Sequence, residues 1–224
     1  DAKTGVTKAI MEANSLTAQR TAAASALASS LLSNASASSL LMIGTGALAS
    51  RLIRAHASVR PIRQVYVWGR NFAKAKAVCQ QLGNEVFQCS PIQNIVDKIS
   101  EVDIISCATL SPDPLVMGKY LRPGQHIDLV GAYKKDTRES DDEVMKKGVI
   151  FVDTFGGSQE SGDIYLPLRA GIIQTEDIKG DLFSLCSGES QARKNEKEIT
   201  VFKSVGHALE DLAAASYYYK QFKN

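Results

Sequence analysis

Short apolar runs alternate with helix-like segments through the middle of this chain. The runs are rich in Val, Ile, Leu and aromatic residues, as buried strands are. The predicted strands are 40–44, 64–69, 85–87, 102–109, 126–131 and 149–153, and the predicted helices among them are 44–59 (after a turn), 71–82, 91–99 and 139–147. Acids open the last of these helices, lysines close it, and Gly148 stops it. This alternation predicts a doubly wound parallel α/β sheet.

Further helices flank the alternating region. Residues 16–32 are rich in Ala and Leu and contain no Gly or Pro, which favours a helix. The small polar stretch 33–39 is typical of a linker. From about residue 160 the pattern is less regular, until an apolar stretch at 199–206 and a predicted terminal helix over 207–222.

Composition and charge exclude several classes of protein. The 224 residues include 26 Lys and Arg and 24 Asp and Glu, a net charge of +2. This balance gives no reason to expect nucleic acid or an anionic membrane as a partner. No run of about 18 apolar residues is present to span a bilayer. Asp1 opens the chain, and no basic-then-apolar secretory signal follows it.

The cysteines and histidines do not form a metal-binding pattern. The four cysteines are Cys79, Cys89, Cys107 and Cys186, with no CxxC spacing, and no two of the three histidines lie four residues apart. We therefore expect no metal site. Free thiols of this kind are typical of a reducing compartment, so we expect a cytoplasmic protein.

The turn after the first predicted strand carries the clearest chemical signal. Residues 44–49 read GTGALA, which fits the G-x-G-x-x-A fingerprint of Rossmann dinucleotide-binding domains. Gly44 permits the tight turn, and Gly46 lets the backbone approach a pyrophosphate. The pyrophosphate would then lie on the N–H groups at the helix start, beside Ala47 and Leu48. A glycine turn without a ligand is the alternative interpretation, although the strand–turn–helix context favours a cofactor.

The end of the second predicted strand indicates which nicotinamide cofactor is preferred. NAD enzymes usually place an acid here for the ribose 2′-hydroxyl, but no acid lies between Val65 and Glu85. Gly69 is followed by Arg70 and Asn71, and Lys74 adds a second positive charge. These side chains suit a 2′-phosphate, so we expect NADP(H) to be preferred over NAD(H). Arg70 as an ordinary surface arginine is the alternative.

Two further loops are expected at the cofactor, because ligands bind outside the carboxyl ends of parallel strands. One contains Thr109 and Leu110 after the fourth strand, and the other begins at Val130 after the fifth. Either loop could equally be an ordinary strand-to-loop junction.

Six blocks of sequence, taken together, resemble the ornithine cyclodeaminase/mu-crystallin family, in the branch of ketimine reductases and pyrroline/piperideine-2-carboxylate reductases. The blocks are LTAQRTAAAS (16–25), MIGTGALA (42–49), VWGRN (67–71), HIDLVGAY (126–133), ESGD (160–163) and VFKSVGHALED (201–211). The resemblance implies that Arg20 lies near the cofactor phosphates and binds the substrate carboxylate. It also implies that Lys203 and Ser204 lie near the nicotinamide.

The resemblance also predicts how the chain is divided. It implies a helical segment of a substrate and dimerisation domain at 1–36, an NADP-binding domain at 37–160, and a segment at 161–224 that returns to the substrate domain. Family members carry further residues before the block at Leu16, so Asp1 resembles the middle of a member. The resemblance places a catalytic lysine in that preceding part, so we name no catalytic residue here. It further implies a homodimer for the full-length protein.

One departure from the family pattern bears on the reaction. In the family pattern that this chain resembles, ornithine cyclodeaminases have the pair Gly-Asp in the loop after the fifth strand. This chain has Gly131-Ala132 there. We therefore expect an NADPH-dependent reductase that converts 1-pyrroline-2-carboxylate or 1-piperideine-2-carboxylate to proline or pipecolate. The alternatives are an alanine-type amino-acid dehydrogenase or ornithine cyclodeaminase, and a non-catalytic NADP-binding protein of the crystallin kind.

Overall fold

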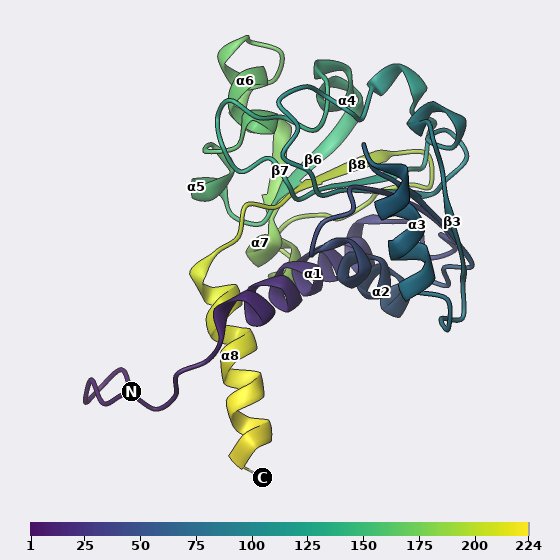
Figure 1. Ribbon diagram of the computed structural model, residues 1–224. Helices are drawn as coiled ribbons and strands as arrows, with labels where there is room; N and C mark the ends of the chain where they lie inside the picture. Colours follow the sequence, from purple (N-terminus) through teal and green to yellow (C-terminus); the bar gives the residue numbers. More distant parts are fainter. Residues whose placement is uncertain (224) are drawn as a thin grey trace.

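The computed structural model describes residues 1–223 and is built around one parallel sheet (Figure 1). Its eight strands follow the order β3-β2-β1-β4-β5-β8-β6-β7. The strands are β1 (Ser39–Ile43), β2 (Gln64–Trp68), β3 (Gln88–Pro91), β4 (Ile104–Cys107), β5 (His126–Leu129), β6 (Gly148–Val152), β7 (Ile178–Asp181) and β8 (Ile199–Lys203). Because the order reverses direction between β1 and β4, the carboxyl ends of these two strands form the edge where such sheets bind ligands.

Helices cover both faces of the sheet. They are α1 (Ala13–Leu32), α2 (Ala49–Val59), α3 (Phe72–Gln81), α4 (Asp142–Lys147), α5 (Phe155–Ser158), α6 (Gly162–Arg169), α7 (Leu182–Ser187) and α8 (Ala208–Lys223). Three short 3₁₀ helices lie at Ile95–Asp97, Gly118–Tyr120 and Thr175–Asp177. Figure 1 shows α1, α2 and α7 on one side of the sheet and α4 and α6 on the other. The fold is therefore a three-layer α/β sandwich.

Alternating side chains along β1 enter two different hydrophobic cores, one on each face of the sheet. In β1, Leu40 and Met42 pack with Leu52 of α2 and other residues of α1–α3. Leu41 and Ile43 point to the opposite face and pack in the cluster that includes Val144 of α4. Successive side chains of a strand face opposite sides, so an uninterrupted apolar run is what a sheet covered on both faces requires.

The Ala-rich helix α1 is held by polar contacts at its C-terminal end. The guanidinium of Arg60 donates hydrogen bonds to the carbonyl oxygens of Ser29, Ser30 and Ser33, at 2.8 to 3.0 Å. The last carbonyl groups of a helix have no partners within the helix, and a cation there also interacts favourably with the helix dipole. Arg60 thus ties α1 to the end of α2.

The structure confirms the doubly wound parallel sheet and corrects three predicted elements. The strand expected at 85–87 is wrong: Val86 is 97% exposed, and β3 begins at Gln88, whose N–H donates to the carbonyl of Arg63. The helix expected at 91–99 is also wrong, since Pro91 closes edge strand β3 and only a single 3₁₀ turn follows. The helix expected at 139–147 begins only at Asp142, which leaves Glu139 in the preceding loop.

The C-terminal part of the chain completes the sheet. Strand β8 lies between β5 and β6 and pairs with both, and β7 forms the edge beside β6. Both strands come from the segment 161–224, so the sheet joins residues from both sides of the domain boundary predicted at residue 160. The division into a cofactor domain and a substrate domain stays a prediction.

Candidate functional site

A cavity of about 540 Å³ opens at the carboxyl ends of β1, β2, β4 and β5. It brings together eleven of the residues expected at a cofactor, namely Gly44, Gly46, Ala47, Leu48, Gly69, Arg70, Asn71, Lys74, Thr109, Leu110 and Val130. A larger hollow of about 690 Å³ lies between α1 and α2. It contains none of the expected residues and lies away from the carboxyl ends of the strands, so the smaller cavity is the candidate site.

The glycine turn shapes one wall of this cavity. Gly44 has φ of +122°, and a Cβ there would lie 2.5 Å from the carbonyl oxygen of Ala108, so only glycine lets the turn pack on the end of β4. A Cβ on Gly46 would meet nothing within 4 Å, so its backbone faces open space. Leu48, the N-cap of α2, makes no side-chain capping bond. These features suit a phosphate group bound on the N–H groups of the helix start.

Positive charge gathers at the far end of the same cavity. Arg70 and Lys74 are exposed and line it, and no Asp or Glu of the described residues does so. Asn71 uses its side-chain oxygen to cap α3, accepting from the N–H of Ala73 at 3.0 Å and of Lys74 at 3.4 Å. The cap fixes the start of α3 and leaves only the amide NH₂ of Asn71 to donate to a ligand.

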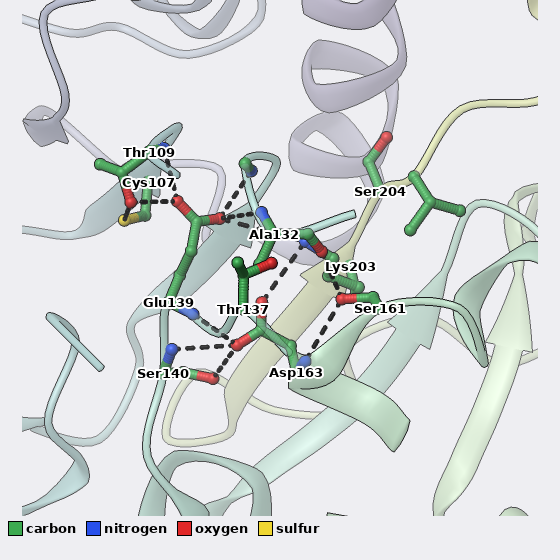
Figure 2. A network of polar contacts seen from close by, with 12 residues as sticks. Cys107, Thr109, Ala132, Thr137, Glu139, Ser140, Ser161, Asp163, Lys203 and Ser204 are labelled. Carbon is green, nitrogen blue, oxygen red and sulfur yellow. Dashed lines mark hydrogen bonds and ion pairs between the residues drawn. The ribbon is translucent and has the colours of Figure 1, made fainter. Parts of the chain in front are cut away.

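One buried carboxylate holds the two loops that form the floor of the cavity (Figure 2). Oε1 of Glu139 accepts the backbone N–H of Thr109 at 2.7 Å and its hydroxyl at 3.0 Å. Oε2 accepts the N–H of Gly131 at 2.6 Å. A Cβ on Gly131 would overlap the backbone of Thr109, so the loops meet only because this residue is glycine. Glu139 therefore sets the spacing between the β4 and β5 loops.

Lys203 supplies the positive charge beneath this carboxylate. Its Nζ is fully buried, 3.4 Å from Oδ2 of Asp163 and 4.0 Å from Oε2 of Glu139, without a hydrogen-bond partner among residues 1–223. Oδ1 of Asp163 meanwhile accepts the N–H of Glu139 and both the N–H and hydroxyl of Ser140. Burial raises the pKa of Glu139, and the charge of Lys203 opposes that rise. Figure 2 shows these groups as one network.

Ser204 and Arg20 lie beyond the carboxyl end of β8, outside the cavity. The Ser204 hydroxyl donates to Asp153 at 3.2 Å. The Arg20 guanidinium packs against Gly206 and pairs with Glu210 at 2.8 Å and Asp211 at 2.9 Å. Lys203 does not line the cavity either. The roles expected for Arg20, Lys203 and Ser204 at substrate and nicotinamide stay predictions.

Sequence reasoning missed the two acids of the network. Glu139 was expected to open a helix, and Asp163 was noted only as part of the ESGD block. A buried acid and an exposed acid look alike in sequence, because burial depends on segments far apart in the chain. Leu115 and Tyr133 also line the cavity and were not expected there.

In the described part of the chain, no group of three or more His, Cys, Asp or Glu side chains could hold a metal ion. No helix within residues 1–223 is long and apolar enough to cross a membrane.

Comparisons with known proteins agree with this geometry. The profile of the ornithine cyclodeaminase/mu-crystallin family matches residues 1–224. Delta(1)-pyrroline-2-carboxylate reductase of Paracoccus denitrificans is 37% identical, over 97% of this chain and 69% of its own length. Ketimine reductase mu-crystallin of Mus musculus is 32% identical, over 100% of this chain and 68% of its own.

A solved structure extends the likeness to three dimensions. It is Thermococcus litoralis Delta(1)-pyrroline-2-carboxylate reductase in complex with NADH and L-proline. It superposes with a TM-score of 0.95 at 34% identity, and the match covers 98% of this chain and 69% of that one. Because the matches run through the cofactor loops and the flanking helices alike, this chain belongs to the ornithine cyclodeaminase/mu-crystallin family.

Proposed function

We propose that this protein reduces a cyclic imino acid, 1-pyrroline-2-carboxylate or 1-piperideine-2-carboxylate, with NADPH as the hydride donor. The products are proline and pipecolate. The observation that carries the proposal is the cavity at the β1–β4 reversal, which combines an uncapped helix start, two glycine-dependent loop contacts and the cations of Arg70 and Lys74. The similarity to pyrroline-2-carboxylate and ketimine reductases supports the substrate class.

The residues present fit a dinucleotide. The N–H groups at the start of α2 suit the pyrophosphate, and the open backbone of Gly46 leaves room for it. When bound, the reduced nicotinamide supplies the hydride that converts C=N to C–N. The protein's part is to orient the ring, to hold its carboxylate and to keep the cofactor loops apart at the right distance. Glu139 performs the last of these tasks through its bonds to Thr109 and Gly131.

We assign Arg20 to the substrate carboxylate. A guanidinium can hold a carboxylate through two parallel hydrogen bonds, and Arg20 of α1 places its guanidinium against Gly206, which follows the carboxyl end of β8. In the structure it is paired with Glu210 and Asp211. A two-bond grip that uses Nε would replace Asp211 with the substrate carboxylate. An Arg20→Lys variant, which keeps the charge but loses the fork, should raise KM for the imine more than it lowers kcat.

The preference for NADPH rests on Arg70. An Arg70→Ala change should weaken NADPH binding about 10- to 100-fold, because one charge-assisted bond to a phosphate is worth roughly 1.5 to 3 kcal/mol. NADH binding should change little. The matched control is Arg63→Ala, since Arg63 is exposed and precedes the opposite end of β2. Titration of each variant with both cofactors measures this, and equal losses for NADPH and NADH would refute the assignment.

The reaction itself is tested by following NADPH oxidation with each of the two imines. Turnover with either supports the proposal. Turnover only with pyruvate and ammonia would identify an alanine-type dehydrogenase, and ammonia release from ornithine would identify a cyclodeaminase. Cyclodeamination is disfavoured because the cyclodeaminase pattern has an aspartate at the position of Ala132. Ala132 is buried and has no acidic group. NADPH binding without turnover of any imine would point instead to a binding protein.

A further inference from the structure

Two cysteine thiols from different elements meet beside the cofactor half of the sheet. Cys79 lies on α3 and Cys89 on β3, and the Cys89 thiol donates to Sγ of Cys79 at 3.0 Å. Both are free thiols. The segment from 82 to 87 connects the two elements, so the contact arises from the way α3 folds back onto the edge strand.

Packing holds both sulfurs where they are. Cys79 is a member of the core cluster between α3 and the sheet, and Cys89 packs against the same cluster. Strand pairing places Cys89 opposite Val65 of β2. A disulfide has its sulfurs about 2.05 Å apart, so the two atoms need to approach by only about 1 Å.

We propose that Cys79 and Cys89 form a reversible intramolecular disulfide when the protein meets a peroxide. A thiolate attacks one peroxide oxygen, the O–O bond breaks, and a sulfenic acid and one water result. The second thiol then attacks the sulfenic sulfur, the S–S bond forms, and the thiol's proton leaves with the sulfenic hydroxyl as a second water. Two thiols are oxidised by two electrons in all, and hydrogen peroxide is reduced to two waters. This site is independent of imine reduction, so either proposal can fail without the other.

The surroundings decide which thiol reacts first. The hydrogen bond donated by Cys89 lowers the pKa of Cys79, whereas the same contact and burial raise the pKa of Cys89. The lower pKa favours Cys79 as the attacking thiolate and Cys89 as the thiol that resolves the sulfenic acid. The other cysteines lack this arrangement. Burial and the nearby Glu139 carboxylate raise the pKa of Cys107, and Cys186 is exposed on α7 with no cysteine partner among the described residues.

The bond would join α3 to β3 close to the cofactor. α3 starts at the Asn71 cap and carries Lys74, so it forms part of the wall that we assign to the 2′-phosphate. The disulfide closes a short loop and restricts the unfolded chain, which should raise the thermal midpoint by roughly 5 °C. The oxidised protein should therefore keep the same fold, with α3 and β3 covalently joined.

The test uses a Cys186→Ser background, so that the exposed thiol does not react. After treatment with hydrogen peroxide, residues 77–98, a single tryptic peptide that contains both cysteines, should lose the mass of two hydrogen atoms. Additional cleavage after Glu85 should leave two fragments joined until dithiothreitol separates them. Cys89→Ser should accumulate a Cys79 sulfenic acid that dimedone traps, and Cys79→Ser should not form one at Cys89.

Three results would overturn the proposal. The first is two free, alkylatable thiols after peroxide treatment. The second is oxidation of Cys79 to a sulfinic acid without any joined fragments. The third is a joined species with a lower thermal midpoint than the reduced protein, because a bond formed only in unfolded chains would strain the native packing of α3 on β3.

Discussion

Removing the buried cation tests the loop-holding network most directly. The Lys203 ammonium is fully buried between the carboxylates of Asp163 and Glu139. A Lys203→Met variant keeps the length and apolar stem of the side chain while it deletes the charge. Both carboxylates then stay buried without a cation beside them. The backbone and hydroxyl donors described above still compensate part of their charge.

The distances set the size of the expected effect. At an effective dielectric constant of about 20, unit charges 3.4 Å and 4.0 Å apart attract by about 5 and about 4 kcal/mol. Burying the ammonium costs several kcal/mol, which offsets much of this attraction. Removal of one partner from a buried ion pair typically destabilises by about 3 to 5 kcal/mol. We expect Lys203→Met to lower the free energy of unfolding by about that amount near neutral pH.

The stability lost in Lys203→Met should depend on pH. Burial already raises the pKa of Glu139 above the ordinary value of 4.5, and Lys203 restrains that rise. An acid whose pKa is higher in the folded state binds more protons there, so stability falls as pH rises between the two pKa values. Without Lys203 the pKa of Glu139 in the folded protein rises further, so the pH range over which stability falls extends to higher pH. The variant should therefore lose more stability at about pH 8 than at about pH 5.

Urea unfolding at several pH values measures these free energies. Lys179→Met is the matched control, because the Lys179 side chain is 52% exposed and its Nζ lies 3.9 Å from Asp177, so its loss should cost less than about 1 kcal/mol. Adding Asp163→Asn to Lys203→Met should recover part of the stability, since asparagine keeps the Oδ1 acceptor and removes one buried charge. A loss below about 1 kcal/mol for Lys203→Met, with no pH dependence, would refute the electrostatic role.

Two further predictions concern glycine packing and a buried histidine. Gly131→Ala places a Cβ on the Thr109 backbone and 2.6 Å from Oε1 of Glu139, so it should destabilise by about 1 to 3 kcal/mol and weaken cofactor binding, whereas Gly156→Ala, with nothing within 4 Å, should do neither. Burial lowers the pKa of His126 from 6.5 to about 3. The unfolded chain therefore binds more protons between these values, so stability falls as pH drops through this range, and His126→Gln should flatten the acid side of a stability-versus-pH curve.

One wall of the candidate cavity was largely predictable because its signals are local. Gly44 and Gly46 lie in a strand–turn–helix segment of the kind that binds phosphate groups. Arg70 follows the neighbouring strand, at the spacing expected of a residue that pairs with a 2′-phosphate. The floor of the cavity was not predictable in this way. Glu139 was assigned to a helix because acids favour helix starts, yet the helix begins at Asp142. The partners of its carboxylate lie on three other segments, at Thr109, Gly131 and Lys203.

By itself the sequence determined the fold class, the glycine turn and the charged end of the cavity, because each depends on a run of neighbouring residues. Only the tertiary structure decided that β8 inserts between β5 and β6, which brings Lys203 beneath Glu139. It also decided that Cys79 meets Cys89 and that Arg20 pairs with Glu210. The physical reason is that strand order and buried charge pairing are settled by packing between segments distant along the chain, which periodicity does not report.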